Sequence, residues 1–521
     1  MLRAVSKELE QGGSTMNQIA TKYDEQEFNK LWHSIKADGK ITLGTLIYHA
    51  KQNGWVDPRA SVIPVNKHTK DIRNAQLFAN ANRDRLLFIA ETNEVLIYDA
   101  NGWVTSSYGE ADRAAKEVVA KMHTEAAKLF KQSFDCEQAK ELIRHAGYSS
   151  TAQRIQAMIE LAKSEDGMSA SISNFDADPN LLGVINGILD LKAKKLLQSS
   201  SKLLVSKRAN VTFDLTVKCP KWMLFLDDIQ PDKSIQRLLQ QLAGAFLCGD
   251  SNLQKLIFLY GQGANGKSTF IELLAWLLGD YSKRIATELL MQHQRSPQGP
   301  SPDIVGLKGR RLVYCNEVEE GRRLAEARVK ELTGGDSLTG RAPYAKEEIT
   351  FKPSHKLVMV GNHQPEIHDM SYGMWRRMLL VPFEQVIPDK KRDPNLLEKL
   401  KLEGAGILNW ALAGQHDLSK NGLKVPDKVN GATAMYQDEQ DILGEWVRDN
   451  CTIIIGASIS KGDCYRAYQV WAKGRGQNPL AQGRFTRRLA DRGYKLDAGR
   501  RNITGLELNS HGLKAINFLI Y

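Results

Sequence analysis

The sequence predicts an α/β protein, with helices ahead of the α/β core and a small basic domain behind it. Four short apolar runs alternate with helical patterns in the second half of the chain, at 256–260, 311–316, 356–361 and 378–383. The first run leads directly into a glycine-rich loop and an amphipathic helix over 269–278. Strand, loop and helix in that order are typical of an α/β fold.

The length of 521 residues exceeds what one hydrophobic core usually organises, so we expect several domains. Amphipathic spacing predicts a small helical region within 1–58 and a mixed, then helical, region over 59–249. The α/β core with a helical extension follows at 250–445. The basic C-terminal part, 446–521, is expected to form a domain of its own.

The composition is that of an ordinary soluble protein, with 42% hydrophobic and 25% charged residues. No run of about 18 apolar residues occurs, so no membrane partner is expected. The first residues lack the apolar stretch of a signal peptide, and the six cysteines show no C-x-x-C spacing. We therefore expect a cytoplasmic protein with reduced thiols.

The glycine-rich loop GQGANGKST (261–269) carries the strongest functional signal. It matches G-x-x-x-x-G-K-S, in which backbone N–H groups close around a polyphosphate at a helix N-terminus. Lys267 is expected to reach the β- and γ-phosphates of ATP, and the Ser268 hydroxyl to bind Mg²⁺. An ordinary glycine-rich turn is the alternative. The residues expected to bind the nucleotide are Gly261, Gly263, Asn265, Gly266, Lys267, Ser268 and Thr269.

The run 311–316 ends at Glu317, which follows Lys267 by 50 residues. A carboxylate is expected there, beside the Mg²⁺ and the attacking water. Because Asn316 stands where the common D-E pair has its first acid, Glu317 is the candidate for polarising water. How Mg²⁺ is shared among Ser268, water and Glu317 stays open, and an exposed glutamate at a strand end is the alternative.

Two further positions suit nucleotide hydrolysis. Asn362 follows the run 356–361 and fits a sensor that holds the γ-phosphate or the lytic water; a buried turn asparagine is the alternative. Arg376 and Arg377 precede the run 378–383. A guanidinium neutralises transition-state charge at the γ-phosphate, and ring ATPases supply one from the neighbouring subunit. A surface pair of arginines is the alternative.

The segment 338–353 predicts a hairpin with Tyr344 and Lys346 at its tip. In a ring such tips project into the central channel, where lysine meets phosphates and an aromatic ring meets sugars or bases. The alternative is an inert surface hairpin.

The basic C-terminal part holds eleven Lys/Arg against three Asp/Glu over 461–505. Apolar spacing predicts a helix ending near Gly474, a second helix stopped by Gly493, and then a hairpin. Helix, basic helix and basic hairpin follow one another as in a winged-helix domain that binds DNA, although a protein-docking module would also suit this order. The arginines expected to contact DNA are Arg484, Arg487, Arg488, Arg500 and Arg501.

Five segments in this order resemble superfamily 3 helicases: GQGANGKST, YCNEVEEG, VKELTGGD, LVMVGNHQP and GMWRRMLLVPF. The branch with the nearest likeness is the phage- and plasmid-type primase–helicases, which are related to the poxvirus primase–helicase. NGILDL, the Cys-Pro-x-Trp at 219–222 and QQLAGAFLCGD resemble the helical domain that precedes the ATPase in that branch. The resemblance implies an AAA+ hexameric ring that hydrolyses ATP with Mg²⁺ and moves 3′ to 5′ on single-stranded DNA.

Residues 32–55 resemble the small helical tail that follows the primase domain of that branch. No catalytic carboxylate cluster with histidine precedes them, so we expect no primer synthesis by this chain. A separate primase or polymerase could dock on the N-terminal helices. The expected protein is a replicative helicase of a phage, prophage or plasmid-type element, acting on single-stranded and forked DNA. An ATP-switched origin-binding initiator is the alternative, and a P-loop signalling or defence ATPase is a third.

Overall fold

The computed structural model describes 70–99, 101–106, 109–132, 137–198, 200–292, 301–316, 319–341, 343, 348–476 and 478–517. The helical region predicted within 1–58 therefore lies outside the described residues. Glu317, Tyr344 and Lys346 also lie outside them. Among the residues that are described, no helix combines the length and the apolar character needed to cross a bilayer. The five cysteines of this part, Cys219, Cys248, Cys315, Cys451 and Cys464, are buried free thiols.

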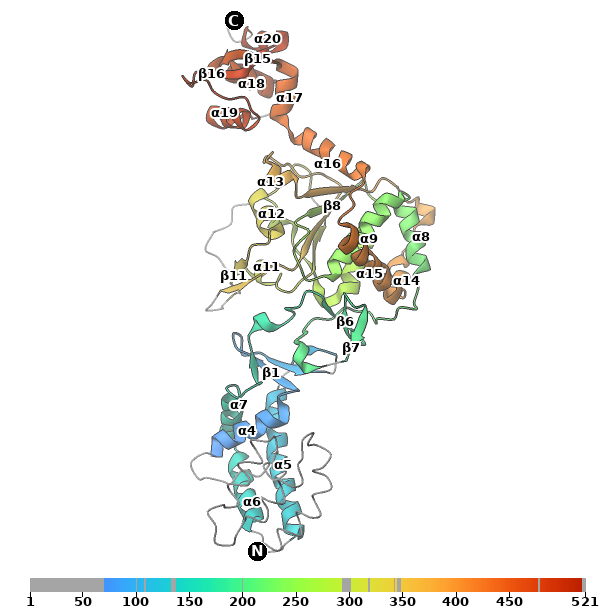
Figure 1. Ribbon diagram of the computed structural model, residues 1–521, viewed down its shortest axis with the longest axis vertical. Coiled ribbons are helices and arrows are strands. Elements are labelled where there is room, and N and C mark those ends of the chain that lie inside the picture. The colour runs from blue at the N-terminus through green and yellow to red at the C-terminus, as the bar shows by residue number, and fades with distance from the viewer. Residues whose placement is uncertain are drawn as a thin grey trace, which may run out of the picture. The chain divides into compact units, whose positions relative to one another are not determined.

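The first described part combines helices with a small sheet (Figure 1). Its helices are α4 (Lys70–Asn82), α5 (Glu110–Gln132), α6 (Glu137–Ser149) and α7 (Ala152–Ala162). The strands are β1 (Leu86–Ile89), β2 (Val95–Tyr98), β3 (Trp103–Thr105) and β4 (Ser169–Ala170), in the order β3-β2-β1-β4. Phe78, Phe88, Val118 and Met158 are buried in one core, which joins the helices to β1.

A second, three-stranded sheet leads toward the α/β core. It consists of β5 (Leu181–Val184), β6 (Gly187–Asp190) and β7 (Lys195–Leu197), all antiparallel. The two-residue turn between β5 and β6 is Ile185-Asn186, and Gly187 begins β6. Gly187 has φ +143°, a backbone conformation that favours glycine.

The α/β core is built on a five-stranded parallel sheet in the order β14-β8-β13-β10-β9. Its strands are β8 (Leu256–Tyr260), β9 (Ser282–Arg284), β10 (Leu312–Asn316), β13 (Lys356–Gly361) and β14 (Met378–Pro382). All residues of β13 and β14 are buried, which explains why these strands read as unbroken apolar runs. Because the strands are parallel, the residues that follow them lie at one edge of the sheet.

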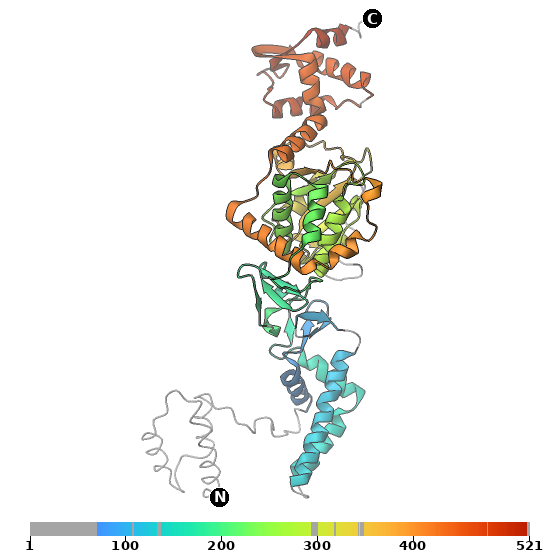
Figure 2. The same cartoon turned by 90° about the vertical axis from the view of Figure 1, so that its right-hand side faces the viewer.

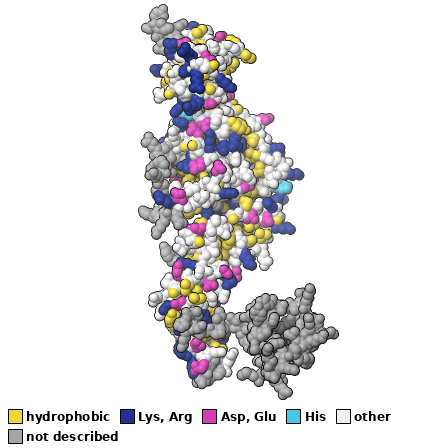
Figure 3. All heavy atoms as spheres, turned by 60° about the vertical axis from the view of Figure 1, so that its left-hand side comes forward, with side chains coloured by type: hydrophobic (Ala, Val, Ile, Leu, Met, Phe, Trp, Pro, Cys, Tyr) yellow, Lys and Arg dark blue, Asp and Glu magenta, His cyan; other side chains and the backbone are white. Residues whose placement is uncertain are grey.

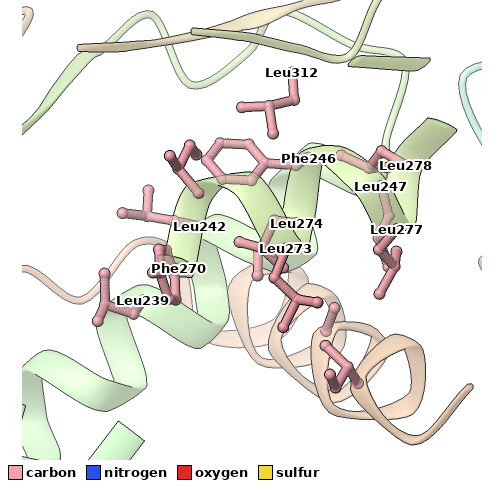
Figure 4. Close-up of a cluster of buried hydrophobic side chains, with 14 of the residues drawn as sticks. Leu239, Leu242, Phe246, Leu247, Phe270, Leu273, Leu274, Leu277, Leu278 and Leu312 are labelled. Atoms are coloured by element: carbon pink, nitrogen blue, oxygen red, sulfur yellow. The ribbon is translucent and has the colours of Figure 1, made fainter. Parts of the chain in front are cut away.

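One hydrophobic core joins this sheet to helices α8 (Pro220–Ile229), α9 (Lys233–Leu247) and α10 (Lys267–Leu278). Figure 4 shows leucines of α9 and α10 in one cluster with Phe246 and Phe270, and Leu312 of β10 lies beside Phe246. Asp232 caps α9 through the backbone N–H groups of Ser234 and Ile235. One hydrophobic core thus includes residues on both sides of position 250, and the four-part division of the chain stays a prediction.

The helical extension consists of α14 (Leu396–Lys401), α15 (Gly404–Asn421) and α16 (Asp427–Gln440). In Figure 2 the orange helices stand beside the green helices of 220–278. Helix α15 lies against α9, and a Cβ at Gly244 would come within 2.1 Å of the Gln415 backbone nitrogen. The Glu403 carboxylate accepts hydrogen bonds from the backbone N–H groups of Lys221 and Trp222, so it caps the N-terminus of α8.

The remaining short elements of the core are α11 (Pro302–Val305), α12 (Glu326–Thr333) and α13 (Tyr372–Trp375). Strands β11 (Leu338–Gly340) and β12 (Ile349–Phe351) pair antiparallel. This pairing agrees with the hairpin predicted over 338–353, while its tip lies outside the described residues.

The C-terminal part contains α17 (Ile442–Asn450), β15 (Cys451–Ser460), α18 (Lys461–Gly474), α19 (Gln482–Asp491), β16 (Asn502–Leu508) and α20 (Ser510–Asn517). Trp446, Tyr468, Phe485 and Leu489 are buried in its core. Strands β15 and β16 pair antiparallel, and Leu496 bridges Ile503. The helix predicted to end near Gly474 does so, and α19 ends two residues before Gly493, at φ +95°.

Candidate nucleotide site and nucleic-acid interface

The glycine-rich loop connects β8 to α10 at the carboxyl edge of the sheet. Gly261 is buried, and a Cβ there would lie 2.1 Å from the Phe383 carbonyl oxygen. Gly266 has φ +79°, and its Cβ would lie 2.4 Å from Ile229 Cγ2 of α8. The loop therefore needs glycine at both positions. At Gly261 the reason is close packing, and at Gly266 it is close packing together with the positive φ. Gly263 differs from both, since no atom of the described residues lies within 4 Å of its Cβ position.

Lys267 is the first residue of α10 and is 4% exposed. Its ammonium donates to the Gly261 carbonyl oxygen at 2.6 Å, to Asn265 Oδ1 at 2.8 Å and to Asn362 Oδ1 at 3.1 Å. Burial lowers the pKa of Lys267 to about 8. The cation thus lies within the loop, ringed by neutral oxygens and close to where a phosphate chain is predicted.

Asn265 holds the loop in this shape. Its side chain is 2% exposed, and Nδ2 donates to the carbonyl oxygens of Gln262 at 2.5 Å and Phe383 at 2.9 Å. Because Oδ1 accepts from Lys267, the one amide links the loop, the lysine and the end of β14. The sequence identified Asn265 only as a member of the motif. Its structural role was not predictable, because the motif does not show that its buried side chain reaches the end of β14.

Asn362 follows β13, which lies beside β8 in the sheet. The pairing of Gly361 with Tyr260 brings Asn362 to the glycine-rich loop, and its side-chain oxygen reaches Lys267. The position is the one that a sensor of the γ-phosphate requires, although the sensing role itself stays a prediction.

At the end of β10, the Asn316 side-chain oxygen is buried and has no hydrogen-bond partner within the described part of the chain. The Asn316 backbone carbonyl accepts from Thr287 Oγ1 at 2.8 Å. The Ser268 side chain is exposed at the start of α10. The Asn316 side-chain oxygen and the Ser268 hydroxyl are hard ligands of the kind Mg²⁺ takes, so the chemistry of these two residues fits a magnesium ion. Glu317, the predicted carboxylate, lies outside the described residues.

Arg376 and Arg377 lie at the opposite edge of the sheet from the glycine-rich loop. The Arg377 carbonyl oxygen accepts from the Leu256 backbone N–H at 2.8 Å, and the Arg376 carbonyl oxygen accepts from Lys255 Nζ at 2.6 Å. Both contacts are with residues at the start of β8, whereas the loop follows its end. The Arg376 side chain is exposed, and Arg377 is half-buried and donates to the Gly373 carbonyl oxygen. The fold therefore does not bring either arginine to the loop of its own chain.

The C-terminal arginines fall into two groups. Arg484, Arg487, Arg500 and Arg501 are exposed. Figure 3 shows Lys and Arg side chains gathered over this domain. Arg488 instead donates to the His368 carbonyl oxygen, so its guanidinium is partly engaged within the protein. Burial lowers the pKa of Arg488. Sequence spacing could not separate Arg488 from Arg487, because the partner comes from a loop 120 residues away.

Two family models match the chain. Residues 75–231 match the family described as D5 N terminal like, and residues 259–377 match a family of unknown function (DUF5906).

Several curated viral proteins are similar to this chain. A candidate helicase, L207/L206 of Acanthamoeba polyphaga mimivirus, is 30% identical over 327 residues, which cover 58% of this chain and 34% of the relative. The candidate helicase 022R of Frog virus 3 is 26% identical over 268 residues, covering 48% and 28%. The candidate primase C962R of African swine fever virus (isolate Warthog/Namibia/Wart80/1980) is 27% identical over 215 residues, covering 40% and 22%. The chain thus spans about a third or less of the length of these relatives.

Among solved structures, the apo C-terminal region of NrS-1 aligns with 85% of this chain and 100% of its own length. The identity is 13% and the TM-score is 0.47, and a likeness of that size carries no information about function.

The parallel five-stranded sheet, with a glycine-rich loop at its carboxyl edge, is consistent with the core of a P-loop ATPase. The matched segments are typical of the superfamily 3 helicase region of primase–helicases. The resemblance predicted from the order of the motifs is thereby confirmed.

Proposed function

We propose that the chain is an ATP-dependent replicative DNA helicase that forms an AAA+ hexameric ring and moves on single-stranded DNA, 3′ to 5′ by resemblance. The observation that carries the proposal is the contact of Lys267 with Asn362, 3.1 Å apart at the carboxyl edge of the sheet. Two strands far apart in sequence converge there on one predicted phosphate position. The names of the similar viral proteins, both candidate helicases, support the substrate class.

In this proposal Lys267 neutralises charge that develops on the β- and γ-phosphates. Asn362 positions the lytic water or the γ-phosphate, and Glu317 polarises that water. The helix N-terminus at Lys267 adds backbone N–H groups and a positive dipole end, which favour the same anion.

Magnesium would be held by the Ser268 hydroxyl and the Glu317 carboxylate, and the Asn316 side-chain oxygen would add a further ligand. When bound, the ion would neutralise charge between the β- and γ-phosphates. The unpartnered oxygen of Asn316 supports this assignment, because a buried acceptor without a donor costs free energy unless a ligand satisfies it.

The arginine pair supports a ring rather than a monomer as the active form. Arg376 and Arg377 contact the start of β8, far from the loop at its end. A subunit would therefore supply its arginine to the nucleotide of a neighbouring subunit. The active site would then be complete only at an interface between two copies.

DNA would be gripped at two places. Tyr344 and Lys346, which lie between β11 and β12 in the sequence, would contact the strand in the channel. The C-terminal part would act as a winged-helix domain whose exposed arginines contact phosphates without reading sequence. An engaged arginine such as Arg488 would contribute less.

The biological setting is part of the same proposal. We place the enzyme in a phage, prophage or plasmid-type element, in the cytoplasm of a bacterial host. Forked DNA and a separate primase or polymerase are its proposed partners.

An origin-binding initiator that uses ATP only as a switch is the second candidate, because a basic C-terminal domain would suit either role. Strand displacement decides between them. Duplexes with a 3′ tail or a 5′ tail are incubated with the protein, Mg²⁺ and ATP. The proposal expects displacement on the 3′-tailed duplex; ATP-dependent binding without displacement on either duplex would favour the initiator.

A further inference from the structure

Lys267 has no hydrogen-bond donor left for a nucleotide. A lysine ammonium carries three N–H donors and no acceptor. All three are directed at protein oxygens, those of Gly261, Asn265 and Asn362. A phosphate oxygen can bind Lys267 only if one of these three oxygens gives way.

The three oxygens are not equally easy to displace. Those of Gly261 and Asn265 belong to the loop itself, and Asn265 is also tied to the Phe383 carbonyl oxygen at 2.9 Å. The Asn362 oxygen comes from a different strand, and its 3.1 Å bond to Lys267 is the longest of the three. Asn362 is also exposed, so a displaced amide can turn into water. The bond to Asn362 is therefore the one a phosphate would replace.

We infer that Asn362 competes with the nucleotide for Lys267: its side-chain oxygen occupies the third N–H donor of the lysine until a phosphate oxygen replaces it. The inference rests on the proposed function and adds a second role to the predicted sensor. Displacement frees the amide of Asn362, which can then face the γ-phosphate or the lytic water. A phosphate oxygen thus takes the place of Asn362 Oδ1 at Lys267 Nζ, so phosphate binding and the release of Asn362 are a single event.

Affinity for ADP separates this role from γ-phosphate sensing, because ADP has no γ-phosphate. Asn362→Ala removes the competing oxygen, so Mg²⁺-ADP should bind more tightly, by about threefold to tenfold for one hydrogen bond to a charged group partly replaced by water. Asn362→Asp strengthens the competitor by adding a negative charge beside Lys267. The aspartate variant should therefore bind Mg²⁺-ADP more weakly than the wild type.

Hydrolysis should respond in the opposite sense to binding. Asn362→Ala also removes the group that positions the water, so kcat for ATP should fall while ADP binds more tightly. A merely structural role for Asn362 would instead weaken binding and hydrolysis together. His363→Ala is the matched control, because His363 is the next residue and is exposed. Its ADP affinity should equal that of the wild type.

The experiment is calorimetric titration of the full chain with Mg²⁺-ADP, using wild type, Asn362→Ala, Asn362→Asp, His363→Ala and Lys267→Ala, with folding checked by circular dichroism. The order Ala tightest, wild type intermediate and Asp weakest supports the inference. Equal or weaker binding by folded Asn362→Ala, while Lys267→Ala abolishes binding, overturns the inference alone. If folded wild type binds no ADP, or binds it as Lys267→Ala does, the proposed function falls with it.

Discussion

The backbone N–H of Leu256 donates to the carbonyl oxygen of Arg377 at 2.8 Å, which fixes the arginine pair at the start of β8. The glycine-rich loop begins after Tyr260, at the other end of that strand. Five residues of strand span about 16 Å at roughly 3.3 Å each, which is longer than an arginine side chain. The arginines and the loop of one chain therefore face opposite edges of the same sheet.

Mixing of subunits tests this arrangement. Arg376→Ala or Arg377→Ala subunits and Lys267→Ala subunits should each be inactive as pure rings. A mixed ring contains some interfaces in which an intact loop meets an intact arginine, so ATP hydrolysis should recover in part. The measurement is ATPase rate against mixing ratio, with mixed rings verified by differently tagged subunits. Rings that mix but show no recovery at any ratio would assign the arginines a role within their own subunit.

Lys267→Ala should lower ATP hydrolysis by about 100-fold or more, since a charge that stabilises the transition state is lost. The fold should survive, because the hydrogen bonds of the Lys267 ammonium to described residues are with the loop and with Asn362, not with the hydrophobic core. Steady-state phosphate release and a thermal melt measure the two effects. Turnover near that of the wild type in a folded variant would remove Lys267 from the site.

The two glycines of the loop provide a matched pair. A Cβ at Gly261 would lie 2.1 Å from the Phe383 carbonyl oxygen and 2.5 Å from Asn265 Nδ2, whereas a Cβ at Gly263 would meet no described atom within 4 Å. Gly261→Ala should therefore displace the loop, destabilise the fold by about 1–3 kcal/mol and abolish nucleotide binding. Gly263→Ala should leave the stability of the nucleotide-free protein unchanged. Thermal unfolding with and without Mg²⁺-ADP compares them, and equal behaviour of the two variants would contradict the packing described here.

The C-terminal arginines should differ in their salt dependence. Arg487 is exposed, while Arg488 donates to the His368 carbonyl oxygen. Arg487→Ala should flatten the slope of log affinity against log salt concentration for single-stranded DNA by about 0.7. Arg488→Ala should change that slope less. Fluorescence anisotropy over a salt series gives the slopes. If neither Arg487→Ala nor the double variant Arg500→Ala/Arg501→Ala alters them, the domain docks protein instead of DNA.

Lys346→Ala should uncouple unwinding from hydrolysis. The lysine is proposed to contact the strand that is pulled and not the nucleotide, so basal ATPase should persist while strand displacement is lost. Tyr344→Ala should weaken displacement as well, through lost stacking on the bases. Normal displacement by Lys346→Ala would show that the hairpin does not grip the strand, which would favour the initiator.

Local patterns predicted the strands and the loop closely. The apolar run 256–260 forms β8 with the same limits, and the helix after the loop ends at Leu278 as expected. The order of the strands was not accessible in the same way. Neighbours such as β8 and β14 lie more than 100 residues apart in the chain, and hydrophobic periodicity does not encode which strands pair.

The motifs predicted which residues belong to the candidate site, but not which of them contact one another. Lys267 and Asn362 were identified separately, but their contact depends on the pairing of β8 with β13. The bond from Asn265 to Phe383 likewise joins residues 118 positions apart. The location of Arg376 and Arg377 follows from the direction of β14 in the sheet. Motifs thus gave the chemistry of the site, and the topology gave its geometry.

A comparison of strand displacement by the wild type and by Lys267→Ala tests most directly whether the protein is an ATP-driven helicase. Wild type and Lys267→Ala are compared on a 3′-tailed duplex at concentrations where both bind the DNA equally, with ATP and with a nonhydrolysable ATP analogue. We expect the wild type to displace the strand with ATP but not with the nonhydrolysable analogue. Lys267→Ala should displace it with neither nucleotide. Wild-type protein that hydrolyses ATP and binds the tail, yet leaves the duplex intact, would contradict a helicase.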